Sequence, residues 1–238
     1  MSTPAVINNN HEHIVPACLL TVVGGFLDVY TFLFRGEVFA NAVTGNMVFC
    51  GLHIARAEWT ECLRYLIAII FYALGVLTAE WLRTKVAPTQ KLGWHQIILA
   101  LEIVCLLPII FIPKGHLDFV VNATIAFICA MQVETFRKVH GLPFASTMCT
   151  GNLRSSAEAL FKYLHTGDRK ELGKVCHYYT IIFFFILGAV VAAILMTRYG
   201  EGVFFLAPAG LTIVFFMVST RRLLGALRHW WRSLRPRS

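Results

Sequence analysis

The chain has 238 residues, of which 57% are hydrophobic and 14% are charged, and its formal net charge is +8. Soluble domains contain about 45–50% apolar and about 25% charged residues, so this composition excludes an ordinary soluble protein. It predicts an all-α, polytopic helical membrane protein.

Six apolar runs are long enough to cross a bilayer, whose hydrocarbon core takes about 20 helical residues. Residues 1–13 precede the first run and contain no Lys or Arg. We therefore expect a disordered N-terminus rather than a cleaved signal peptide. The predicted spans cover residues 14–34, 62–82, 94–113, 117–135, 176–197 and 203–220.

One motif occurs twice: an acidic residue in an apolar run is followed sixteen residues later by the triplet Thr-Gly-Asn. The copies consist of Asp28 with Thr44, Gly45 and Asn46, and of Glu134 with Thr150, Gly151 and Asn152. Each residue of the second copy lies 106 positions after its counterpart, as Thr150 does after Thr44. The pattern predicts two membrane repeats, 14–116 and 117–220, followed by a tail, 221–238.

The segments that carry the triplets, 38–55 and 144–164, are poor candidates for lipid-facing spans. In the first, Asn41, Thr44 and Gly45 would form a polar stripe along a helix, and the second is more polar still. If both segments span, there are eight helices in a parallel duplication. If both are half-helices, there are six spans and the halves are inverted. The six-span alternative keeps more Lys and Arg in the cytoplasm, so we favour it.

The triplets and the acids each allow two interpretations. Thr-Gly-Asn can pack one helix against another, with Gly at the contact, or it can line a binding site where a helix is broken. A carboxylate in lipid needs a cation or a proton. A static pair with Arg35, Arg137 or Arg154 would make an acid structural, whereas exchange of a substrate or proton would make it a coupling group.

The C-terminal tail is strongly basic and interleaves arginine with tryptophan. This pattern predicts a helix that binds the anionic headgroups of a bilayer and places the C-terminus in the cytoplasm. With six spans the N-terminus is cytoplasmic too, and we expect no nucleic-acid partner. The predicted membrane-surface residues are Arg221, Arg222, Arg228, Trp230, Trp231 and Arg232.

From about residue 14 to residue 220 the chain resembles the YoaK-like family of small, mainly bacterial integral membrane proteins, a domain of unknown function. The resemblance rests on GGFLDVYTFLFRGEVFANAVTGNMV and AMQVETFRKVHGLPFASTMCTGNL, which include Gln132 and the second Thr-Gly pair. It implies about six spans and a plasma-membrane location, and it supplies no activity. Glu134 departs from the family pattern, in which a small or amide residue is more frequent, and this departure puts a two-acid mechanism in doubt.

The sequence carries no metal-binding helix, nucleophile elbow, P-loop or dinucleotide-binding turn, so we expect neither an enzyme nor a cofactor or metal site. We expect a small secondary transporter or permease for a small solute or ion, proton-coupled, with the two acids, the two triplets and Arg154 at its site. The alternative is a non-transporting interaction protein that acts through its Arg-rich tail. Gly24, Gly25 and Gly188 are candidate contact faces for a homodimer.

Overall fold

The computed structural model describes residues 14–86, 93–139, 142–143 and 149–233. Nearly all of them are helical, and the two very short strands pair antiparallel. In chain order the elements are α1 (Ile14–Phe34), α2 (Val43–Ala55), α3 (Trp59–Val86), α4 (Trp94–Leu106), the 3-10 helix η1 (Leu107–Phe111), α5 (Asp118–Thr135), β1 (Lys138–Val139), β2 (Leu142–Pro143), α6 (Cys149–Thr166), α7 (Arg169–Tyr199), the 3-10 helix η2 (Glu201–Phe205) and α8 (Leu206–Ser233).

Among the described residues, six helical segments are long and apolar enough to cross a membrane: α1, α3, α4 with η1, α5, α7, and η2 with the first part of α8. The predicted spans are confirmed at these places. The helix α2 has only 13 residues, which is about 20 Å of helix. The helix α6 is long enough but too polar. The chain is therefore a polytopic helical membrane protein with six spans and two additional helices.

The segment between α1 and α2 folds back along α1. Gly36 and Glu37 both have positive φ, at 83° and 58°, and reverse the chain. Asn41 then lies beside the middle of α1, because its backbone N–H donates to Asp28 Oδ1 at 2.7 Å and its side-chain Nδ2 donates to the Gly24 carbonyl at 3.2 Å. The predicted polar stripe is therefore wrong in one respect: the helix begins at Val43, and Asn41 belongs to the non-helical segment before it, residues 35–42.

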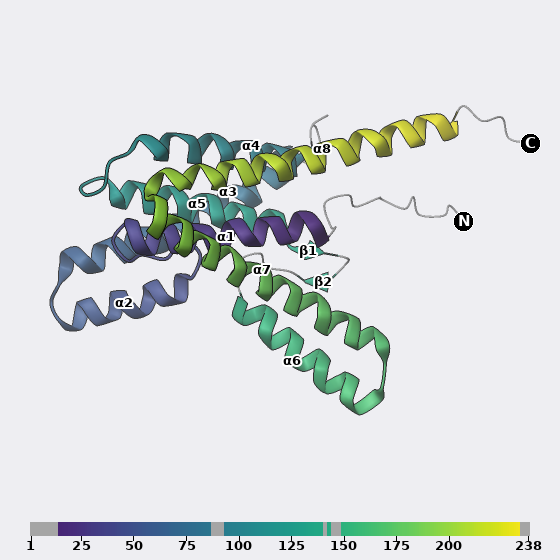
Figure 1. The fold of residues 1–238 in the computed structure, drawn as a ribbon, viewed down its shortest axis with the longest axis horizontal. Coiled ribbons are helices and arrows are strands. Elements are labelled where there is room, and N and C mark those ends of the chain that lie inside the picture. The colour runs from purple at the N-terminus through teal and green to yellow at the C-terminus, as the bar shows by residue number, and fades with distance from the viewer. Residues whose placement is uncertain (1–13, 87–92, 140–141, 144–148, 234–238) are drawn as a thin grey trace, which may run out of the picture.

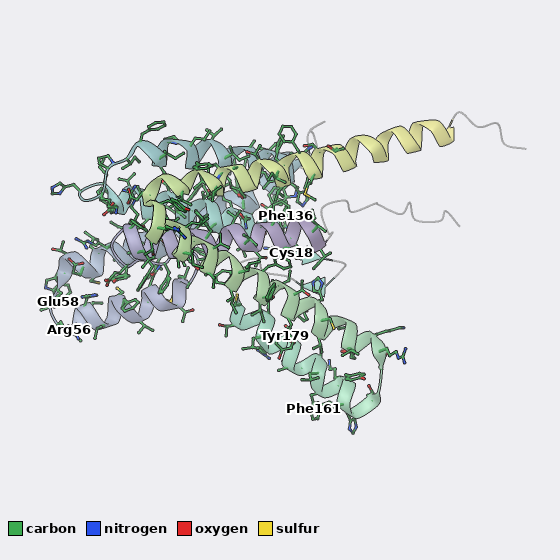
Figure 2. All side chains as sticks on the ribbon, in the orientation of Figure 1. Cys18, Arg56, Glu58, Phe136, Phe161 and Tyr179 are labelled. Atoms are coloured by element: carbon green, nitrogen blue, oxygen red, sulfur yellow. The ribbon has the colours of Figure 1, made fainter. Side chains whose placement is uncertain are left out.

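The two short helices point in opposite directions. Figure 1 shows α2 and α6 leaving the middle of the bundle toward opposite ends. Arg56 and Glu58, in the turn after α2, lie at the opposite end of the bundle from Cys18 and Phe136 (Figure 2). Each short helix thus occupies only one side of the bundle, as half-helices would. Residues 144–148, the start of the second predicted half-helix, lie outside the described residues.

The contacts between helices come in corresponding pairs, some between the two halves of the chain and some within one half. The main contacts join α1 to α7 and α3 to α5, while α2 packs on α3 and α6 packs on α7. Likewise α1 contacts α8, α4 contacts α5, and α4 contacts α8. If each element in this list is replaced by the element about 106 residues away, the same set of pairs is obtained. The spans of one half of the chain therefore pack mainly against spans of the other half.

Glycines permit the two main interhelical contacts. A Cβ at Gly25 would collide with the Phe185 carbonyl of α7, and one at Gly188 would collide with the Val22 backbone of α1. The glycine at position 75 has the same relation to α5. Close backbone approach through small residues is the usual way in which helices associate in membranes. Gly25 and Gly188 were predicted as dimer faces, and this is corrected: both are already buried in a contact within the chain.

Candidate functional site

A cavity of about 560 Å³ lies where the non-helical segment 35–42 and the first turns of the two short helices meet. Its volume falls within the range of about 300–1,000 Å³ that is typical of small-molecule sites. The walls come from both halves of the chain and are largely apolar. The lining residues include Asp28, Phe32, Phe39, Asn41, Thr44, Tyr72, Cys149, Thr150, Gly151 and Phe185.

Asp28 is 6% exposed and lies on the face of α1 that borders the cavity. Its Oδ1 accepts the hydrogen bond from the Asn41 N–H, and the backbone N–H groups of Ala40 and Ala42 lie close enough to stabilise the same carboxylate. The acid therefore sits at the N-terminal end of α2, where the helix dipole favours negative charge. Within the described part of the chain, no Lys, Arg or His forms an ion pair with Asp28.

The first turns of α2 and α6 reach the cavity from opposite sides. Thr44 comes from α2, whereas Thr150 and Gly151 come from α6, and all three are lining residues. The first N–H groups of a helix lack partners within the helix and form a positive end. Neither threonine hydroxyl forms a hydrogen bond with a described residue, and both side chains border the cavity. The predicted site residues Asp28, Thr44, Thr150 and Gly151 thus lie together.

The remaining triplet residues support the backbone. Asn46 is fully buried, and its side chain bonds both backbone groups of Phe39: Oδ1 accepts from the N–H at 3.0 Å, and Nδ2 donates to the carbonyl at 2.7 Å. Gly45 leaves room for the Phe39 ring. Asn152 is buried on α6 but does not line the cavity. Gly45 and Asn46 thus hold the segment before α2 against the helix rather than joining two helices.

Glu134 lies away from the cavity. It forms an ion pair with Arg137, which also pairs with Glu80 of α3 at 2.6 Å. Arg154, the other predicted partner of a buried acid, pairs instead with Glu158 on the exposed face of α6 at 2.9 Å. Neither Glu134 nor Arg154 therefore joins Asp28, although the sequence repeat placed the two acids in equivalent positions.

Arg35 also has a different partner from the one predicted. It is 2% exposed, and its three donors reach the Tyr30 hydroxyl, the Asp118 carboxylate and the Ile112 carbonyl, at 2.8, 3.0 and 2.8 Å. This network ties the end of α1 to the start of α5. Asp28 is thus free of the static salt bridge that would have made it purely structural.

Sequence reasoning missed most of the cavity wall. Asn41 and Phe39 reach the cavity because residues 35–42 fold back into the bundle, whereas Tyr72, Cys149 and Phe185 are brought there by the packing of α3, α6 and α7. Burial, and then the charge of Asp28, raise the pKa of the Cys149 thiol to about 11. All seven cysteines are free. The side chains of the tail predicted to bind lipid, 221–238, lie outside the described residues.

A model of a protein family of unknown function, DUF1275, matches residues 16–217. This chain belongs to the DUF1275 family. It is 26% identical over 160 residues to the UPF0700 transmembrane protein YoaK of Bacillus subtilis (strain 168), a match that covers 64% of the chain and 69% of the relative. No solved structure matches the chain. The predicted resemblance to YoaK-like membrane proteins is confirmed, and DUF1275 membership assigns no activity.

Proposed function

We propose that this DUF1275 chain is a small secondary carrier, and not an enzyme, whose substrate site is the cavity between the half-helices. The observation that supports this most is that the N-terminal turns of α2 and α6, from different halves, line one cavity together with Asp28. Asp28 binds the solute or a proton in turn.

Broken helices favour this function over a purely structural one. In a bilayer, non-helical backbone is tolerated where protein buries it or where it lines a cavity. Carriers with inverted repeats place such half-helices at the substrate site near the midplane. Here the segment 35–42 before α2 lies beside the middle of α1. Its Asn41 N–H donates a hydrogen bond to Asp28, the one acid among the described residues that line the cavity.

The corresponding helix pairs support an inverted internal duplication. Three spans and one half-helix in each half would place the halves in opposite orientations. Alternating access then follows from the movement of one half against the other around a fixed site. The main contacts, α1 with α7 and α3 with α5, both join the two halves, and they are the surfaces along which such movement would occur.

The proposed location is the plasma membrane, with both termini in the cytoplasm. The tail carries six arginines and no acid, and cytoplasmic loops are enriched in Lys and Arg. In this orientation α6 lies in the cytoplasmic half of the membrane and α2 in the outer half. Lipid binding by the tail and homodimer formation are compatible with this arrangement and are not required by it.

The test is uptake by purified protein in liposomes. Solutes that raise the melting temperature of the wild-type protein are tested for uptake driven by a pH gradient, with Asp28→Asn and Glu134→Gln as matched variants. Both substitutions replace a carboxylate by its isosteric amide, but only one acid lies in the cavity. We expect Asp28→Asn to abolish coupled uptake and Glu134→Gln to retain it. Uptake that survives Asp28→Asn unchanged would contradict the proposal.

A further inference from the structure

The charge of the cavity wall restricts the class of solute. Among the described residues that line the cavity, Asp28 is the only one with an acidic or basic side chain, apart from the Cys149 thiol and the Tyr72 phenol. The titratable groups that face Asp28 are Tyr72 of α3, Cys129 of α5 and Cys149 of α6. None of them supplies a positive charge at neutral pH, so among the described residues Asp28 has no counter-cation, and its carboxylate must be balanced by a proton or by a bound cation.

One buried acceptor of the wall, Asn41 Oδ1, lacks a hydrogen-bond donor among the described residues. Asn41 is 3% exposed and lines the cavity, and its Oδ1 has no hydrogen-bond partner among the described residues. Its Nδ2 is already used by the Gly24 carbonyl, which fixes the orientation of the amide. Buried polar atoms are normally paired, so this unpaired acceptor, which is enclosed in the wall and reaches a solute only when the wall moves, can take a hydrogen bond from a donor of the ligand. Asp28 and Asn41 are acceptors of the same wall.

The rest of the wall suits an apolar body. Aromatic rings line it from three helices and from the segment 35–42: Phe32, Tyr72 and Phe185 from α1, α3 and α7, and Phe39 from the segment. Ring faces attract organic cations as well as apolar groups. An anion in this cavity would meet the Asp28 carboxylate, and a neutral solute would leave Asp28 to be balanced by a proton, whereas a cation can replace that proton.

We infer that the cavity takes a small organic cation: a protonated amine on an apolar or aromatic body, with its nitrogen between Asp28 and Asn41. This inference rests on the proposed function, since it names the substrate class of the same site. The amine donates to the Asp28 carboxylate and to Asn41 Oδ1, and the body contacts the rings. The hydroxyls of Thr44 and Thr150 bind a further polar substituent where the solute has one.

Three probes of similar shape and different charge test the inference: phenethylamine, 2-phenylethanol and 3-phenylpropanoate. Protein in lipid nanodiscs, with Cys149 as its only cysteine, is alkylated with N-ethylmaleimide, and protection of Cys149 is measured against probe concentration. We expect the amine to protect at a concentration at least about tenfold lower than the other two. Asp28→Asn should remove this preference, while Glu134→Gln should leave it intact. A matched protein that retains only Cys176, an exposed residue, should show no protection.

The inference is overturned if the alcohol or the carboxylate protects at the same or a lower concentration than the amine. Thermal stabilisation of the wild-type protein by the three probes gives the same ranking without any cysteine replacement, should the single-cysteine protein fail to fold. Binding of the amine without uptake would support the inference and contradict the carrier. Coupled uptake of an anion that depends on Asp28 would do the reverse.

Discussion

The contact between α1 and α7 gives the sharpest test of the fold. A Cβ placed at Gly188 would collide with three backbone atoms of Val22, and backbone atoms cannot rotate out of the way. Gly173 lies on the same helix with nothing near its missing Cβ. The substitutions Gly188→Ala and Gly173→Ala are therefore chemically identical and differ only in what the new methyl group meets.

The expected difference follows from two terms. Replacing Gly by Ala within a helix stabilises by about 1 kcal/mol, and this term is common to both variants. Overpacking against a rigid neighbour destabilises by about 1–3 kcal/mol, and this term applies to Gly188→Ala alone. We expect Gly188→Ala to unfold more easily than Gly173→Ala by about 1–3 kcal/mol, with Gly173→Ala at or slightly above the stability of the wild type.

The assay is equilibrium unfolding of each variant by a denaturing detergent in mixed micelles, followed by circular dichroism. Parallel shifts of the transition midpoint give the difference directly if the slopes agree. Equal stability of the two alanine variants would refute the close α1–α7 approach, and with it the packing in which each half of the chain completes the other.

Three further predictions concern the site and its supports. Replacing Asn46 by Ala removes both hydrogen bonds to Phe39, so we expect the free energy of unfolding to fall by about 2–4 kcal/mol in the same assay. Thr44→Val should change it by less than about 0.5 kcal/mol. Equal effects of the two substitutions would contradict the supporting role of Asn46. Because the Cys149 pKa is raised to about 11 and only the thiolate reacts, its alkylation rate should rise about tenfold per pH unit from pH 8 to pH 10, and Asp28→Asn should speed it at pH 8; a plateau near pH 9 would disprove the burial. Arg35→Met leaves Asp118 unpaired and should destabilise by about 3 kcal/mol at low and at high salt alike, whereas a loss that vanishes in high salt would indicate a solvated surface pair.

The spans and the half-helices could be predicted because length and polarity decide them. An apolar run either crosses the hydrocarbon or does not, and the segments carrying Thr-Gly-Asn were too short or too polar to do so. The predicted site also placed Asp28 with the triplets, and Asp28, Thr44, Thr150 and Gly151 line one cavity. The sequence resemblance to a membrane family was confirmed on the same residues.

The composition of the cavity could not be predicted in the same way. Asn41 reaches α1 only because positive φ at Gly36 and Glu37 turns the chain back, and no periodicity signals that turn. The pairing of α1 with α7 cannot be predicted from the sequence pattern either, because the helix surfaces that face lipid and those that face another helix are both apolar. The acids of the two motif copies also have different partners: Asp28 accepts a hydrogen bond from the Asn41 N–H, whereas Glu134 pairs with Arg137.

Access to Cys149 from both sides of the membrane tests the central claim most directly. Protein with this single cysteine is reconstituted in one orientation and treated with a membrane-impermeant thiol reagent from the outside or from the inside, with and without a pH gradient. A carrier with its site between the half-helices predicts labelling from both sides, in proportions that the gradient shifts. Labelling from one side only, under every gradient and with every solute that stabilises the protein, would contradict it.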